Sequence, residues 1–243
     1  MGLLEGKVTI VTGAGTGIGK GIARAFAKEG ALLVLASRNR ENLDETAAEV
    51  RQYGAPVHVV ATDVTDEAQV LRLFESALRD CGRVDILINN SGAFDGGPLD
   101  ELSLETWQKV LAVNLTGPFL CAREAMKIMK AQGGGRIINI GSISAQMCRP
   151  NSAPYNTTKH GLVGLSKSIA LEGREHNVVC SMLHPGNVLT ERRAASAKPQ
   201  DAEPMMTVDE LAMAAVTMAA LPLHVNMLEA IVLPTTQKYL GRG

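Results

Sequence analysis

The sequence from residue 7 to residue 19 is KVTIVTGAGTGIG, and this stretch decides the fold class. The segment Lys7–Val11, with its apolar run Val8–Val11, predicts a short buried strand, and a glycine-rich turn follows it directly. From Ile18 to Glu29 apolar residues recur at helical spacing, and Gly30 is a suitable helix stop. Glycines in such a turn let the backbone approach a pyrophosphate, while the helix N-terminus offers amide donors and partial positive charge. The stretch therefore predicts a strand, a phosphate-binding loop and a helix.

Outward from this stretch, short apolar runs alternate with longer segments of helical periodicity. Repeated strand–helix units imply a parallel sheet with helices on both faces, and right-handed crossovers make it doubly wound. No linker or repeat divides residues 1–243, so we expect a single Rossmann-like α/β domain. The expected strands are Lys7–Val11, Ala31–Ala36, Val57–Ala61, Val84–Asn89, Arg136–Ile140, Val178–Leu183 and Ala230–Leu233. The expected helices are Ile18–Glu29, Glu41–Tyr53, Asp66–Asp80, Leu104–Ala131, Ser152–Asn177 and Thr207–Ala220.

Two segments carry expectations of their own. Gly117-Pro118 should kink the long helix, because proline lacks a backbone N–H and clashes with the preceding turn. The polar, alanine-rich stretch Pro185–Pro204 predicts a loop. Residues 187–206 are expected to shape the substrate pocket, together with residues 93–98 and 143–153.

Composition excludes several classes of protein. Of 243 residues, 46% are apolar and 20% charged, and the net charge of -1 gives no basic footprint for nucleic acid. No run approaches the ~18 apolar residues that would cross a membrane, and the N-terminus lacks a secretory signal. The four cysteines form no C-x-x-C pair, so we expect reduced thiols in a cytoplasmic protein, with neither disulfides nor a metal site.

Further motifs follow the glycine-rich turn in a fixed order. The turn fits T-G-x-x-x-G-I-G through Gly13, Gly17 and Gly19. The later motifs are Asn89-Asn90-Ser91-Gly92 after the fourth strand's apolar run, Asn114 in the long helix, Ser142 after the next strand, Tyr155-x-x-x-Lys159, and Pro185-Gly186 followed by Thr190. From Lys7 to about Thr190 the chain thus resembles the short-chain dehydrogenase/reductase family. Ser91 stands where the family has alanine, and beyond Thr190 the resemblance weakens.

The resemblance implies an oxidoreductase that passes hydride between a nicotinamide cofactor and a small carbonyl or alcohol. It implies that Tyr155 is the general acid/base, Ser142 holds the substrate oxygen, Lys159 binds the nicotinamide ribose, and Asn114 holds a water that links Lys159 to solvent. It also implies a homodimer or homotetramer built on the two longest helices. The expected cofactor-binding residues are Gly13, Thr16, Gly17, Ile18, Gly19, Ser37, Arg38, Asp63, Val64, Asn90, Ser91, Gly92, Tyr155, Lys159, Pro185, Gly186, Val188 and Thr190.

The residues themselves explain this chemistry. Hydride transfer to a carbonyl carbon leaves charge on oxygen, so a proton must arrive there. A free tyrosine is a poor base at neutral pH. Tyr155 and Lys159 are four residues apart on an expected helix and share a face, so the lysine cation favours the phenolate.

The end of the second strand predicts NADP(H) as the cofactor. Enzymes that use NAD place an acidic residue there to bind the ribose 2′-hydroxyl. Here Ser37 takes that place and Arg38 follows. A guanidinium suits the 2′-phosphate of NADP, since it keeps its charge and binds in a bidentate way.

Two alternative functions remain open on the sequence. A ketoacyl-carrier-protein reductase would need a basic docking patch, for which Arg149, Arg192 and Arg193 are candidates. A non-catalytic NADP-binding sensor should have lost Tyr155 or Lys159, yet both are present. Arg192 and Arg193 also qualify as partners for a substrate carboxylate, although solvation in a loop is the simpler interpretation. His184 is expected to be a packed histidine rather than a site residue.

Overall fold

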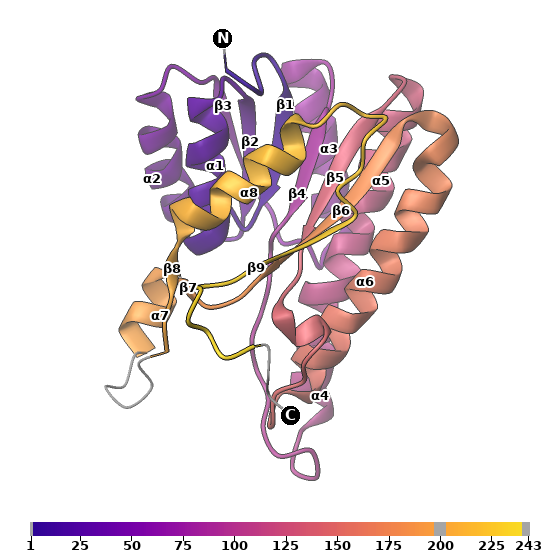
Figure 1. The fold of residues 1–243 in the computed structure, drawn as a ribbon. Helices are drawn as coiled ribbons and strands as arrows, with labels where there is room; N and C mark the ends of the chain where they lie inside the picture. The colour runs from indigo at the N-terminus through magenta and orange to yellow at the C-terminus, as the bar shows by residue number, and fades with distance from the viewer. Residues whose placement is uncertain (1, 197–202, 240–243) are drawn as a thin grey trace.

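In the computed structural model, which describes residues 2–196 and 203–239, a seven-stranded sheet has the order β3-β2-β1-β4-β5-β6-β9 (Figure 1). Each neighbouring pair is parallel, and the order reverses at β1, where the second half of the sheet begins with β4. The expected doubly wound Rossmann-like fold and its strands are confirmed. The strands are β1 Val8–Thr12, β2 Leu32–Ser37, β3 Val57–Ala61, β4 Ile86–Asn89, β5 Gly135–Ile140, β6 Val178–Pro185 and β9 Glu229–Val232.

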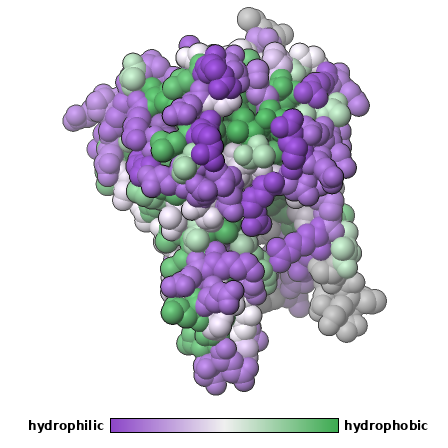
Figure 2. All heavy atoms as spheres, turned by 180° about the vertical axis from the view of Figure 1, so that it is seen from behind, coloured by the Kyte–Doolittle hydropathy of each residue, from purple (hydrophilic) through white to green (hydrophobic). Residues whose placement is uncertain are grey.

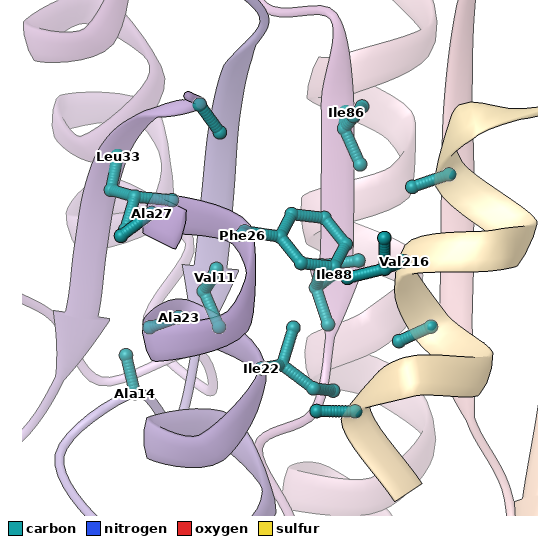
Figure 3. Close-up of a cluster of buried hydrophobic side chains, with 14 of the residues drawn as sticks. Val11, Ala14, Ile22, Ala23, Phe26, Ala27, Leu33, Ile86, Ile88 and Val216 are labelled. Carbon is teal, nitrogen blue, oxygen red and sulfur yellow. The ribbon is translucent and has the colours of Figure 1, made fainter. Parts of the chain in front are cut away.

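Helices cover both faces of the sheet, as the alternation of strand side chains requires. On β1, Val11 belongs to the apolar cluster under α1, α2 and α8, whereas Ile10 belongs to the cluster on the other face, under α3, α5 and α6. Phe26 of α1 is fully buried and lies between the sheet and α8 (Figure 3). The helices are α1 Gly17–Lys28, α2 Arg40–Arg51, α3 Glu67–Cys81, α4 Leu104–Leu111, α5 Gly117–Ala131, α6 Ala153–Gly173, α7 Glu191–Ser196 and α8 Val208–Ala220.

Side-chain caps fix where two of these helices begin. Asp66 caps α3 by accepting a hydrogen bond from the backbone N–H of Gln69 at 3.1 Å. Thr207 and Glu210 cap α8 reciprocally, each side chain accepting from the other residue's backbone N–H. Such caps satisfy amides that have no partner inside the helix, which is why both helices begin within one residue of the predicted position.

The expected kink at Gly117-Pro118 is wrong in its place and its kind. The break lies one turn earlier, where residues Ala112–Thr116 form a π-helical segment between α4 and α5. The N–H of Gly117 bonds to the carbonyl of Ala112, five residues back. Pro118 sits in the first turn of α5, where a missing N–H does no harm.

The loop expected over Pro185–Pro204 is also wrong in part. Val188–Leu189 forms strand β7, which pairs with β8, Met206–Thr207, and Glu191–Ser196 forms α7. Thr190 lies between β7 and α7. Its carbonyl accepts a hydrogen bond from the N–H of Ala194, and its hydroxyl accepts one from the N–H of Arg193. Residues 197–202 of the expected substrate loop lie outside the described residues.

The surface gives no single dominant apolar face in the view from behind, where hydrophilic residues surround separate hydrophobic patches (Figure 2). Within residues 2–196 and 203–239, no helix has the length and apolar character needed to cross a membrane. All four cysteines are free, and burial raises the pKa of Cys121 and of Cys180 to about 12. These two thiols are therefore inert.

Candidate active site

The glycine-rich turn forms the floor of a cleft at the carboxyl ends of β1 and β4, where the sheet order reverses. Such a switch point is where open α/β sheets bind ligands. Gly17 has φ +56°, which disfavours any residue with a Cβ. A Cβ at Gly19 would lie 2.3 Å from the carbonyl oxygen of Gly13, so the turn closes only with glycine there. Gly19 therefore shapes the turn without lining the cleft.

The side chains of Asn90 and Thr12 hold the glycine-rich turn in place through hydrogen bonds. The Asn90 amide donates to the carbonyls of Thr12 and Gly13 at 3.0 and 3.1 Å. The Thr12 hydroxyl accepts from the backbone N–H groups of Asn90 and Ser91. These contacts tie the end of β1 to the end of β4, so Asn90 positions the glycine turn as well as lining the cleft.

The cleft has a volume of about 630 Å³ and extends to the end of β2. Ser37 and Arg38 line this end, and the Arg38 side chain is exposed, with no hydrogen bond or ion pair to any described residue. The Ser37 hydroxyl donates to the carbonyl of Asn39 at 3.2 Å. Asp63 and Val64 line the cleft beside them, after β3. The residues present fit a phosphate-bearing dinucleotide, because a glycine cradle and a helix N-terminus adjoin an unpaired guanidinium.

One acidic side chain binds the first backbone amide of α1. The Glu191 carboxylate accepts a hydrogen bond from the backbone N–H of Gly17 at 2.9 Å. The N-terminus of α1 attracts negative charge, and here α7 supplies it. Sequence reasoning missed this contact, because Glu191 is 174 residues from Gly17 and belongs to no motif.

Ser142 and Tyr155 line a second, smaller cavity of about 140 Å³. Tyr155 also lines the main cleft, so the two spaces meet at its side chain. The ring of Phe94 packs edge-on against the Tyr155 ring, with centroids 5.0 Å apart. The Ser142 hydroxyl oxygen accepts from the N–H of Ser144 at 3.1 Å, which leaves its own O–H free to donate.

Lys159 lies one helical turn below Tyr155 on α6. Its Nζ is 5.6 Å from the centroid of the Tyr155 ring, and it donates to the carbonyl of Ile140 at 2.8 Å. Lys159 is buried yet lines the main cleft. The expected shared face of Tyr155 and Lys159 is therefore present.

Asn114 sits in the middle of the π-helical segment and lines neither space. Its amide exchanges two hydrogen bonds with the backbone of Ala93, at 2.7 and 2.8 Å, and donates to the Thr158 hydroxyl at 3.3 Å. Asn114 therefore reaches Lys159 only through the neighbouring residue on α6. The water-holding role that the family resemblance implies for it stays a prediction.

His184 is packed in the core, as expected. It is fully buried, and its Nδ1 lies 3.0 Å from the carbonyl oxygen of Ser142, directly behind the small cavity. Burial holds the pKa of His184 below its ordinary value, so the ring is neutral at pH 7. A neutral ring that donates from Nδ1 fixes the peptide of Ser142 without adding charge to the site.

Most of the predicted site residues meet in one place. Gly19, Asn114 and Pro185 line neither space and support the residues that do. Phe94 and Glu191 lie in segments that were expected to shape the pocket, but their contacts were not predicted, because no local pattern encodes them. Those that line the main cleft are Gly13, Thr16, Gly17, Ile18, Ser37, Arg38, Asp63, Val64, Asn90, Ser91, Gly92, Tyr155, Lys159 and Thr190, and those that line the small cavity are Ser142, Tyr155, Gly186 and Val188.

Known proteins are similar to this chain in both sequence and fold. The family model described as short chain dehydrogenase matches residues 7–201, and the chain belongs to this family of oxidoreductases. D-threitol dehydrogenase of Mycolicibacterium smegmatis is 38% identical over 188 residues, which are 77% of this chain and 72% of that protein. A granaticin polyketide synthase putative ketoacyl reductase of Streptomyces violaceoruber is 40% identical over 185 residues, 75% of this chain and 68% of its own. The crystal structure of an actinorhodin polyketide ketoreductase variant with NADPH has a TM-score of 0.89 and 30% identity, and covers 96% of this chain and 98% of that one.

Proposed function

We propose that the protein transfers hydride between NADP(H) and a small carbonyl or alcohol, with Tyr155 as the general acid/base. The observation that carries the proposal is that Tyr155 belongs to both spaces at once. It lines the cleft that fits a dinucleotide and the cavity that holds Ser142. A substrate oxygen in the small cavity would therefore have two hydroxyl donors beside it.

The side chains of the site account for the proton transfer that accompanies hydride transfer. The bound nicotinamide supplies or accepts the hydride at carbon. The Tyr155 hydroxyl gives its proton to the substrate oxygen, and the Ser142 O–H donates to the same oxygen as negative charge develops. The nearby Lys159 cation stabilises the phenolate that remains. The reverse reaction uses the same groups, with the phenolate removing the alcohol proton.

The support for NADP(H) over NAD(H) comes from the end of β2. Ser37 places no carboxylate beside the ribose site, and the exposed Arg38 offers a guanidinium without a partner among the described residues. The structural relative that was crystallised with NADPH is consistent with the same choice.

The test of the function is a screen of NADPH oxidation with small oxo acids, aldehydes, sugars and ketoacyl thioesters. We expect turnover of a small free carbonyl, because the cavity that holds Ser142 is small, about 140 Å³. A strict preference for ketoacyl thioesters would favour the ketoacyl-carrier-protein reductase. NADPH binding without turnover of any class would favour the non-catalytic sensor.

Glu191 should weaken cofactor binding. A dinucleotide phosphate and the Glu191 carboxylate both suit the amides at the start of α1, so the two negative groups compete. We expect Glu191→Gln to bind NADPH roughly two- to fivefold more tightly by fluorescence titration, since a charge at a helix N-terminus is worth ~0.3–1 kcal/mol.

The matched control for this prediction is Glu105→Gln, which removes an acid from the first turn of α4 and lines neither space. It should leave NADPH affinity unchanged. Unchanged or weaker binding in Glu191→Gln would show that the carboxylate does not compete with the cofactor.

Two further expectations belong with this function. We propose a homodimer or homotetramer, for which the length of α5 and α6 is the support. A cytoplasmic location also stays a proposal, supported by four free thiols.

A further inference from the structure

The small cavity beside Tyr155 has two arginines in its lining. Arg149 and Arg193 both line it, and none of its lining residues is acidic among the residues that the structure describes. The acidic side chain of Glu203 accepts a hydrogen bond from the side chain of the lining residue Asn187 at 2.6 Å. Glu203 therefore sits behind a lining residue and does not itself line the cavity.

The backbone of Arg149 is held close to the helix turn that carries Tyr155. Asn156, the residue after Tyr155 on α6, accepts from the backbone N–H of Arg149 at 3.3 Å and donates to its carbonyl at 2.8 Å. Asn156 is 8% exposed, so this two-sided clamp is shielded from water. The loop that carries Arg149 is thus tied to the helix turn that carries Tyr155.

The guanidinium of Arg149 has no partner of its own. Its side chain forms no hydrogen bond or ion pair with any described residue, whereas Arg192 donates to the carbonyl of Phe94 at 3.2 Å. A guanidinium is permanently charged and matches a carboxylate with two parallel N–H donors. The exposed side chain of Arg149 is therefore available to bind an anion at the cavity.

We infer that Arg149 binds a carboxylate on the substrate, so that the enzyme acts on small oxo acids and the corresponding hydroxy acids. The inference rests on the proposed function, since it places the substrate carbonyl at Ser142 and Tyr155. In this arrangement the substrate's carbonyl oxygen binds beside Ser142 and Tyr155, and its carboxylate binds Arg149. The small volume of the cavity, about 140 Å³, favours a short acid.

The test compares acids with their neutral esters under identical conditions. The probes are acetoacetate with ethyl acetoacetate, and 4-oxopentanoate with its methyl ester, each with NADPH. Wild type should favour the acid in kcat/KM. Arg149→Gln should lower kcat/KM for the acid roughly ten- to a hundredfold, mainly through KM, and leave the ester within about twofold. Arg149→Lys keeps the positive charge but loses the two parallel N–H donors, so its kcat/KM for the acid should lie between those of wild type and Arg149→Gln.

Arg72→Gln is the matched control, because it removes one exposed arginine on α3, away from both cavities. It should not change the ratio of acid to ester. Equal loss of acid and ester activity in Arg149→Gln would overturn the inference, as would a wild type that prefers the esters. If Tyr155→Phe abolished turnover of the esters in the same assays, the proposed function would stand even where the inference about Arg149 had failed.

A binding measurement keeps the inference testable if neither member of a pair is reduced. The same acids and esters are then titrated calorimetrically into protein saturated with NADP⁺. Tighter binding of the acid that Arg149→Gln removes would support carboxylate recognition, whereas equal or undetectable binding of acid and ester would overturn it. The missing turnover would count against the proposed function alone.

Discussion

Replacing Tyr155 with phenylalanine is expected to lower kcat at least ~10²- to 10⁴-fold, because positioned proton transfer contributes about that much to a rate. NADPH affinity should change by less than a few-fold. The phenyl ring keeps the edge-on contact with Phe94 and the position over Lys159, so only the hydroxyl is lost. Single-turnover kinetics and NADPH titration on the same preparation measure the two effects separately.

Tyr53→Phe is the matched control for this change. The Tyr53 ring also lies beside a lysine, with the Nζ of Lys28 at 5.2 Å from its centroid, but it lines neither site cavity. It should leave kcat unaffected. Activity of Tyr155→Phe within a few-fold of wild type would exclude Tyr155 as the acid/base, whatever the cofactor.

Cofactor preference should reverse on changing Ser37. Wild type is expected to favour NADPH over NADH roughly ten- to a hundredfold in kcat/KM, because a charge-assisted hydrogen bond contributes ~1.5–3 kcal/mol. Ser37→Asp should favour NADH instead, since the new carboxylate repels the 2′-phosphate and accepts from a free 2′-hydroxyl. Steady-state kinetics with both cofactors measure the ratio.

Arg38→Ala separates the arginine from the serine. It should weaken NADPH binding and barely change NADH binding. Arg40→Ala removes a charge two residues away, where the side chain pairs with Asp44 at 2.9 Å and does not line the cleft, and it should leave both affinities unchanged. Equal loss for both cofactors in Arg38→Ala would make Arg38 a structural residue, and a wild type that prefers NADH would refute the NADP assignment.

The sequence predicts those parts of this protein whose cause is local. Buried parallel strands need continuous apolar runs, and each of the seven expected runs became a strand. The spacing of Tyr155 and Lys159 fixed their shared face because helix geometry alone determines it. The glycine turn was predictable for the same reason, since the backbone conformation at Gly17 admits few other residues.

The features that sequence reasoning missed depend on contacts between distant segments. Glu191 reaches Gly17 only because α7 lies against the start of α1, and residues 191–196 alone resemble a solvated loop. The clamp of Asn156 on Arg149 needs the loop to fold back over seven residues. A polar side chain between motifs does not reveal which backbone groups it will bind, so the sequence offered Arg149 only as a candidate for a basic docking patch.

The π-helical segment Ala112–Thr116 sets the rotational phase between two helices. Each residue advances an α-helix by about 100°, and a π turn holds about one residue more than an α turn. The segment therefore rotates α5 relative to α4, so that α5 can pack on the sheet while α4 packs against α6. Deleting a single residue here would turn either Asn114 or the apolar face of α5 away from its partner. The number of residues in the π-helical segment therefore cannot change by even one without moving these groups. A relative that lacks one residue there would differ in its active site as well as in its loops.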